Sequence, residues 1–161
     1  MRLAELTTPR TAGVLLALIS ALGLAGALVI QFGFGEAPCT LCIWQRYPHL
    51  AVVGLGLLAW FWQPRLMVAA AGLVLAGSVV LAAYHVGIEQ GVWALPASCL
   101  ADQQAGSVAE LRALLQDAPA ACDEVSVRFA GLSLAAWNGL ASLAMAGFAF
   151  AAVLRRRSIA Q

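Results

Sequence analysis

The residues with the clearest chemical potential in this sequence are its four cysteines. Cys39 and Cys42 form a Cys-x-x-Cys motif, which is typical of either a metal site or a redox-active dithiol. Structural zinc needs four ligands, often from two close pairs, but Cys99 and Cys122 are far apart in the chain. A disulfide that encloses only two residues restricts the unfolded chain little and stabilises a fold modestly. The spacing therefore favours a redox pair over a zinc site or a structural disulfide.

Arg46 follows Cys42 by four positions, so the two side chains share one face of a helix. A neighbouring cation lowers the pKa of a thiol, and the free amides at the start of a helix, where we expect Cys42, do the same. The alternative role for Arg46 is to extend to lipid phosphate, which is common at the ends of membrane helices. The adjacent cysteine pair favours the chemical role.

The two histidines of the chain also lie near these cysteines in the predicted layout. His49 comes two helical turns after Cys42, and His85 lies near the end of a later apolar run, at a similar expected membrane depth. A histidine pair on two helices is one way to ligate a b-type haem. Haem leaves the four cysteines unexplained, so we disfavour it.

The composition indicates a membrane protein, because 62% of the residues are hydrophobic and only 11% are charged. An apolar helix of about 17–25 residues can cross the hydrocarbon of a bilayer. The uncharged runs predict four such helices, at 12–32, 43–62, 66–86 and 131–154. The fold class is therefore an all-α membrane protein, a four-transmembrane-helix bundle in which residues 1–161 form a single membrane domain. A net charge of +1 with no lysine gives no indication of nucleic-acid binding.

Two of these runs have an alternative reading: 43–62 is the least apolar at its start, and 12–32 could belong to a signal peptide. The second run begins with Pro48 and His49 close to its start, but Trp44, Trp60 and Trp62 near its ends match two interfacial aromatic belts. The first run resembles a signal peptide in its basic start. It is longer than a typical signal core and has no clear cleavage site, so we expect an uncleaved helix.

The arginines predict the orientation of the bundle. With four spans both termini share one side, which holds six arginines and one acid: Arg2, Arg10, Arg65, Arg155, Arg156, Arg157 and Glu5. The positive-inside rule makes this side cytoplasmic. The loops at 33–42 and 87–130 then lie outside with all four cysteines, in a compartment where disulfides persist. Three pairings are possible, and loop membership suggests Cys39–Cys42 and Cys99–Cys122 at rest.

The long outer loop, 87–130, contains a predicted helix. Ser107 and Glu110 form a capping box, and the apolar residues that follow fall on one helical face: Val108, Leu111, Leu114 and Leu115. We expect a short amphipathic helix that lies on the membrane surface. A helix packed on the outer tips of the bundle is equally compatible with the pattern.

Three segments together resemble the DsbB family of bacterial inner-membrane disulfide-forming proteins. They are CTLCIWQR from Cys39, YHVGIEQGVWALPASC up to Cys99, and CDEVSVRFAGLSLAAWN from Cys122. The four-helix layout is also similar, so the resemblance covers nearly the whole chain. It implies a protein-dithiol:quinone oxidoreductase in the bacterial inner membrane, with its redox cysteines on the periplasmic side. The implied partners are a periplasmic DsbA-like thioredoxin-fold protein and membrane ubiquinone or menaquinone, with no metal and no flavin.

The resemblance also implies a role for each cysteine. Reduced DsbA attacks Cys99, whose partner at rest is Cys122. The electrons then pass by inter-loop exchange to the Cys39–Cys42 pair. In this scheme Cys39 exchanges with the long loop, and Cys42 acts on the quinone as a thiolate.

Four further positions match the family's quinone site in the same comparison. Arg46 steadies the thiolate and the quinone, and His85 is a second quinone contact. Leu134 and Trp137 complete the ring pocket. The chain departs from the pattern at Gln45, where some relatives carry an acid. It also places Glu89, a charged residue, one turn beyond His85, either at the quinone or pointing to water.

Two other functions remain open on the sequence. One is a quinone-linked enzyme similar to vitamin K epoxide reductase, whose redox pair normally belongs to a late helix rather than an early one. The other is a structural or transport protein whose four helices carry disulfides that only stabilise the loops. Removal of cysteines from such a protein costs stability and no electron transfer.

Overall fold

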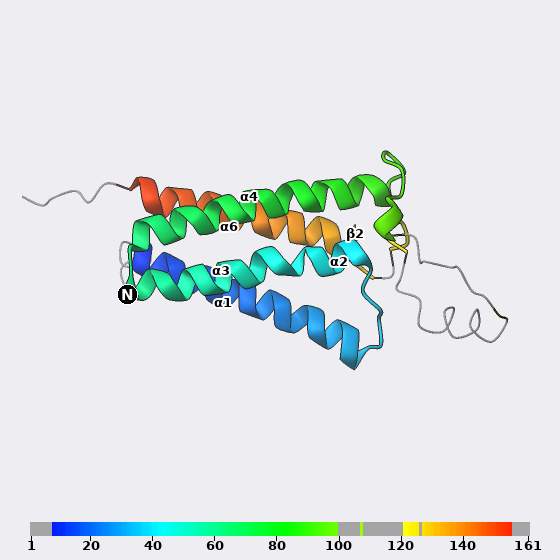
Figure 1. Cartoon of the computed structure of the whole chain (residues 1–161), viewed down its shortest axis with the longest axis horizontal. Coiled ribbons are helices and arrows are strands. Elements are labelled where there is room, and N and C mark those ends of the chain that lie inside the picture. The colour runs from blue at the N-terminus through cyan, green and yellow to red at the C-terminus, as the bar shows by residue number, and fades with distance from the viewer. Residues whose placement is uncertain (1–7, 100–106, 108–120, 126, 156–161) are drawn as a thin grey trace, which may run out of the picture.

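Each long apolar run of the chain folds as a helix, because a backbone in apolar surroundings must satisfy its own hydrogen bonds. The computed structural model describes residues 8–99, 107, 121–125 and 127–155. Long helices run back and forth along one axis (Figure 1). In chain order the elements are α1 (Pro9–Leu28), the π-helical η1 (Val29–Gly33), α2 (Thr40–Trp44), α3 (Arg46–Phe61), α4 (Pro64–Glu89), the 3₁₀ turn η2 (Ala97–Cys99), β1 (Arg128–Phe129), β2 (Leu132–Ser133) and α6 (Leu134–Leu154).

Three of these helical segments are long and apolar enough to cross a membrane: Pro9–Gly33, Pro64–Glu89 and Leu134–Leu154. They correspond to three of the four predicted spans. The second predicted span, 43–62, is not one continuous helix. Its main part, α3, has 16 residues, fewer than the roughly 17–25 that a span needs. With α2 in line before it, the helical path runs from Thr40 to Phe61 (Figure 1).

The break between α2 and α3 at Gln45 has a local cause in Pro48. A proline has no N–H for the carbonyl four residues earlier, here that of Trp44, and its ring crowds that carbonyl. The helix therefore ends at Trp44 and restarts at Arg46. The helical path also starts at Thr40, three residues before the predicted start at 43. Cys39 is consequently the N-cap, whereas the sequence indicated Cys42 at the helix start.

The core of the bundle is built from small and branched side chains. In Figure 1, α4 lies along α6, and α1 lies along α3. Leu16, Val52, Val68 and Leu75 are completely buried between them. Large apolar side chains point outward instead, for example Leu22, which is 71% exposed. An apolar outer surface of this kind suits a bilayer, where lipid tails take the place of water.

Two glycines allow α1 and α3 to approach closely. A Cβ added at Gly56 of α3 would meet the backbone oxygen of Gly13 and the Cβ of Ala17, both on α1. A Cβ added at Gly13 would meet Ala59 at 2.7 Å. Close backbone approach at small residues is a usual way for membrane helices to associate, because burial from water contributes nothing between helices in lipid.

We expect Gly56→Leu to destabilise the bundle by about 1–3 kcal/mol, because the larger side chain forces α1 away from α3. Gly54→Leu is the matched control on the same helix, because no heavy atom lies within 4 Å of a Cβ added there. Its effect should stay within about 0.5 kcal/mol. Unfolding of the two variants in detergent, followed by circular dichroism, measures the difference. Equal stability of both variants would contradict the packing described here.

A short hairpin precedes α6, which therefore begins at Leu134 rather than at the predicted 131. Its strands pair Arg128 with Ser133 and Phe129 with Leu132. Both turn residues, Ala130 and Gly131, have positive φ, as the tight turns of two-residue hairpins require. Ser133 then caps α6, because its hydroxyl accepts from the amide of Ala136 at 3.2 Å.

Some predictions remain outside the described residues. The amphipathic helix that begins at Ser107 is one of them, since residues 108–120 are not described. The cytoplasmic placement of the termini and the outer placement of both loops stay predictions. The helix α4 continues to Glu89, so the long connection starts slightly later than the predicted 87.

Candidate active site

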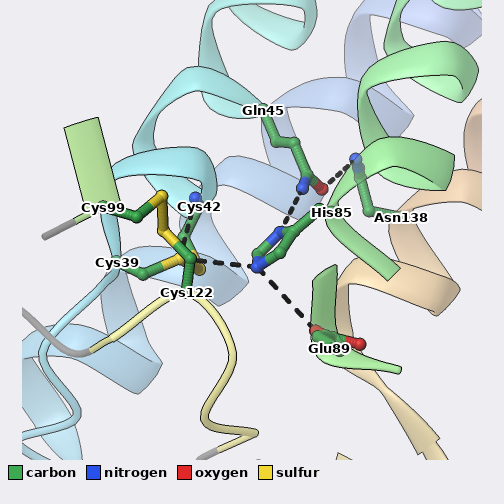
Figure 2. The surroundings of a disulfide bond; sticks show 8 residues. All are labelled: Cys39, Cys42, Gln45, His85, Glu89, Cys99, Cys122 and Asn138. Atoms are coloured by element: carbon green, nitrogen blue, oxygen red, sulfur yellow. Dashed lines mark hydrogen bonds and ion pairs between the residues drawn. A yellow bond between two sulfur atoms is a disulfide. The ribbon is translucent and has the colours of Figure 1, made fainter. Parts of the chain in front are cut away.

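All four cysteines lie together at one end of the bundle. Cys39 is bonded to Cys42, with Cα atoms 5.0 Å apart, and Cys99 to Cys122, with Cα atoms 5.6 Å apart. Cys39, Cys99 and Cys122 belong to one buried cluster, in which Cys42 is partly buried at the edge. Figure 2 shows the two disulfides next to each other. The structure thus brings the two loops' cysteine pairs, distant in sequence, into a single site.

The end of α4 explains how Cys99 reaches this site. Gly91, with φ of +69°, reverses the chain after α4, and the amide of Val92 donates to the carbonyl of Gly87 at 2.8 Å. Trp93 then lies directly on Gly87, where a Cβ would collide with its ring. The same indole stacks on Tyr84 with ring centroids 5.3 Å apart. This fold-back turns the chain towards α2 and leads it to the short turn that carries Cys99.

The polar contacts of the first disulfide gather on Cys39. Its sulfur accepts a hydrogen bond from the amide of Cys42 at 3.1 Å, which makes it the cap of α2. The Nε2 atom of His85 lies 3.6 Å from the same sulfur. Cys39 is 3% exposed, whereas Cys42 is partly exposed on a cavity wall. Both cysteines line the cavity, but they differ in burial, and the polar contacts to His85 and to the Cys42 amide fall on the sulfur of Cys39.

Arg46 is held at the start of α3 by the last turn of the first helix. Its Nη1 donates to the Oε1 of Gln31 at 2.7 Å, and Gln31 belongs to the π-helical segment η1. The guanidinium is half-buried and lines the same cavity as Cys42. Single-turn π segments are frequent at functional sites. The predicted proximity of Arg46 to Cys42 is present as a shared cavity wall.

His85 is buried between the first disulfide and two polar partners (Figure 2). Its Nδ1 lies 2.7 Å from the Nε2 of Gln45, and its Nε2 lies 3.8 Å from a carboxylate oxygen of Glu89. The Glu89 side chain is only 6% exposed. Glu89 therefore faces the histidine and the cavity, and the alternative that it points to water is wrong.

An apolar cavity of about 450 Å³ opens beside these residues, between α1 and α6. Figure 1 shows α1 diverging from α3 towards this end. The polar and charged lining residues are Glu36, Cys39, Cys42, Gln45, Arg46, His49, His85, Glu89, Glu124, Ser133 and Asn138. The other lining residues are small or apolar: Ile19, Gly23, Leu24, Gly26, Ala27, Ile30, Ala37, Pro38, Val125, Val127, Leu134, Ala135, Trp137, Ala141 and Met145.

A quinone has two carbonyl acceptors on a flat ring and an apolar isoprenoid tail. In this cavity Arg46 would offer a guanidinium donor to a ring carbonyl, and the apolar lining residues would surround the tail. No heavy atom lies within 4 Å of a Cβ added at Gly23 or Gly26, so α1 leaves open space along this side. Leu134 and Trp137, expected at the ring, both line the cavity.

Sequence reasoning missed Gln31, Asn138 and Ser20, which hold the site together. Asn138 of α6 bonds to Gln45 and to His49, and Ser20 of α1 bonds to His49. The available signal was their polarity within long apolar runs, since polar residues in membrane helices are usually functional. Their partners could not be read from the sequence because each comes from a different helix.

The fold and the site define a class: a helical membrane protein that carries two adjacent disulfides beside an apolar cavity. The sequence model of the family "Disulfide bond formation protein DsbB" matches residues 9–152. The chain belongs to the DsbB family. It is therefore a membrane protein of disulfide bond formation, and the family implies a disulfide-generating oxidoreductase. Together with three apolar helices, the family indicates a multi-pass inner-membrane protein.

Curated relatives agree with this assignment. The chain is 33% identical to disulfide bond formation protein B of Stutzerimonas stutzeri (strain A1501), over 94% of this chain and 99% of that protein. It is 38% identical to disulfide bond formation protein B of Psychrobacter cryohalolentis over 40% of this chain and 37% of the relative. It is 23% identical to the uncharacterized protein RP370 of Rickettsia prowazekii (strain Madrid E), over 79% and 77% of the two chains. No match to this chain was found among solved structures.

Proposed function

We propose that this protein reoxidises a periplasmic DsbA-like thioredoxin-fold protein and passes the two electrons to membrane quinone. The observation that carries the proposal is the position of Cys42. It belongs to a disulfide that adjoins the second disulfide on one side and faces the apolar cavity on the other. This arrangement supports electron flow from a soluble dithiol to a lipid-borne acceptor, and it favours an enzyme over a protein whose disulfides only stabilise loops.

The first step is attack by a thiolate of the reduced partner on the sulfur of Cys99. A mixed disulfide forms between the partner and Cys99, and the electron pair of the broken bond goes to Cys122. Its thiolate is then placed to attack Cys39, because both sulfurs belong to one buried cluster. That attack forms a Cys39–Cys122 bond and releases Cys42 as a thiolate. The second cysteine of the partner then attacks the mixed disulfide, which releases the oxidised partner and leaves Cys99 as a thiolate. Each step exchanges one disulfide for another, so no external oxidant is needed.

Cys42 then presents its thiolate to the cavity, where the chain supplies the environment for electron transfer. A bound quinone supplies an acceptor for two electrons and two protons. Arg46 provides a positive charge at the same wall, which favours the thiolate over the thiol. The apolar residues of α1 and α6 exclude water and accommodate an isoprenoid tail. His85 lies beside Cys39, the sulfur that must rejoin Cys42 to close the cycle.

The test is a reconstituted reaction. Purified protein in detergent receives the reduced form of a DsbA-type protein and ubiquinone, and in a parallel reaction menaquinone. We expect one molecule of quinone to be reduced for each dithiol oxidised during turnover. When quinone and oxygen are both absent, we expect oxidation of the partner to stop once the two disulfides of each molecule are reduced. Continued partner oxidation without quinone reduction would contradict the proposal.

Arg46→Gln separates quinone recognition from partner recognition. We expect the KM for quinone to rise about tenfold, because a charged donor on the wall of the cavity is lost, while the KM for the partner stays within twofold. Arg65→Gln at the opposite end of the bundle is the matched control for loss of an arginine. An unchanged quinone KM in the Arg46 variant would indicate that this arginine serves lipid phosphate instead.

A further inference from the structure

A continuous chain of hydrogen bonds crosses the bundle from α1 to the first disulfide. All four long helices contribute to it, through Ser20 of α1, His49 of α3, Asn138 of α6, Gln45 at the joint of α2 and α3, His85 of α4 and finally Cys39. Figure 2 shows its last part, in which Asn138, Gln45 and His85 point towards one another. The distances along the chain are 3.3, 2.8, 2.7, 2.7 and 3.6 Å.

The two amides give this chain a single direction. The Nδ2 of Asn138 donates to the Oε1 of Gln45, so the Nε2 of Gln45 is the atom that faces His85. Because that amide nitrogen donates, the Nδ1 of His85 accepts, and the ring proton of neutral His85 is on Nε2. At the other end, Oδ1 of Asn138 accepts from Nε2 of His49, whose Nδ1 accepts from the hydroxyl of Ser20.

The direction of this series of hydrogen bonds determines whether the sulfur of Cys39 faces a hydrogen-bond donor or an acceptor. With its proton on Nε2, His85 offers a donor to the sulfur of Cys39, beside the carboxylate of Glu89 and the backbone of Cys122, which also face the ring. Were Gln45 reversed, its oxygen would face Nδ1, the proton would move there, and Cys39 would meet a lone pair instead. A donor stabilises a thiolate, whereas a lone pair disfavours it.

We propose that Asn138, acting through Gln45, is a positioning residue that keeps the His85 proton on Nε2 and so stabilises Cys39 as a leaving thiolate. The step concerned rests on the function proposed above. When a thiolate of Cys99 attacks Cys122 in the Cys39–Cys122 disulfide, a Cys99–Cys122 bond forms and the electron pair of the broken bond goes to Cys39. His85 donates to the sulfur on which that charge appears, which makes Cys39 a better leaving group.

Asn138→Asp is the most informative variant, because it reverses the direction of the hydrogen bonds that join position 138, Gln45 and His85 without removing them. A carboxylate only accepts hydrogen bonds, so Gln45 must turn its Nε2 towards position 138 and its oxygen towards His85. The proton of His85 then moves to Nδ1, while His49 keeps its proton on Nε2. Asn138→Leu, of similar volume, removes both bonds and leaves Gln45 free in either orientation. Ser142→Ala is the matched control, one turn further along α6, where the hydroxyl bonds to Ser78 outside the chain.

The readout is ¹⁵N NMR of the full chain in detergent with labelled histidine. The chain has only two histidines, so four ring-nitrogen signals report both tautomers. Spectra are taken above the ordinary histidine pKa of about 6.5, where neutral rings dominate. His85→Gln assigns the signals of His49. We expect both rings protonated on Nε2 in the unmodified protein and in Ser142→Ala.

In Asn138→Asp we expect His85 protonated on Nδ1, and in Asn138→Leu a mixture of its two tautomers. A His85 ring protonated on Nδ1 in the unmodified protein would overturn the inference. A His85 proton that stays on Nε2 in both Asn138 variants would also overturn the inference. The leucine variant keeps the test decisive if the aspartate variant does not fold.

A second measurement connects the tautomer to the sulfur. In a Cys42→Ser background Cys39 is a free thiol, and its alkylation by iodoacetamide at neutral pH reports the thiolate fraction. We expect Asn138→Asp to slow alkylation about tenfold, equivalent to one pKa unit, and Ser142→Ala to leave it unchanged. An unchanged rate in the aspartate variant would overturn the role assigned to His85.

The two proposals fail separately in these experiments. A tautomer that responds as expected in a protein without quinone reductase activity would reject the proposed function alone. An active quinone reductase whose His85 tautomer does not respond to Asn138 would reject the positioning role alone.

Discussion

Replacement of Cys42 by serine is expected to abolish quinone reduction while the bundle stays folded. Both cysteines line the cavity, but Cys42 is the more exposed of the two, whereas Cys39 is buried in the cluster that holds the second disulfide. A hydroxyl at position 42 is a far weaker nucleophile than a thiolate at neutral pH, so we expect quinone turnover to fall by at least about a thousandfold. The measurement is the rate of quinone reduction with a reduced DsbA-type partner.

The Cys42 variant needs a control for the effect of a substitution within the Cys-x-x-Cys segment. Thr40→Val lies between the two cysteines and changes neither sulfur, so it should retain turnover. Circular dichroism and elution from a sizing column show whether each variant keeps its fold. Wild-type turnover in Cys42→Ser would place the reacting sulfur elsewhere and contradict the mechanism.

The two cysteines of the long connection are expected to respond in opposite ways to alanine. Cys99→Ala removes the sulfur that the partner attacks, so no covalent adduct should form with a DsbA-type protein. Cys122→Ala leaves Cys99 as a free thiol, whose thiolate attacks the disulfide of an oxidised DsbA-type protein and displaces one cysteine of that protein, but the variant lacks the thiol that passes the electrons on. An adduct should therefore accumulate, to most of the protein rather than a trace.

Non-reducing gel electrophoresis after mixing the variants with partner resolves this difference, because the adduct disappears on addition of a reductant. Cys122 is the completely buried member of the pair, whereas Cys99 is 7% exposed. This difference supports attack at Cys99. If the adduct accumulated in Cys99→Ala and not in Cys122→Ala, Cys122 would be the cysteine that bonds to the partner and Cys99 the one that passes the electrons on.

The two disulfides already adjoin each other in the resting protein. Cys39, Cys99 and Cys122 already share a buried cluster before any reaction, so inter-loop exchange does not need a long movement of the first pair. The fold-back of Trp93 onto Gly87 holds the start of the long connection against α4.

Much of this molecule could be predicted from its sequence, for a physical reason. Helices in lipid are recognisable from length and apolarity alone, because no other arrangement of a single apolar segment satisfies the backbone. Three of the predicted spans accordingly correspond to helices that can cross a membrane. Cys-x-x-Cys and the arginine four residues later are local patterns, so their place at one site was also predictable, and all three side chains line one cavity.

What the tertiary structure decided depends on contacts between helices that are distant in sequence. Pro48 breaks the second helix, and the cap at Cys39 shows that this cysteine meets the helix amides. The proton of His85 is oriented by Gln45, and Gln45 by Asn138, from another helix. Hydrogen-bond direction is a property of the whole assembled network, because each amide can turn either way until its neighbour is present. The residue pattern thus predicts which sulfurs react, and the packing of the helices decides which of them lies beside the His85 ring, here Cys39.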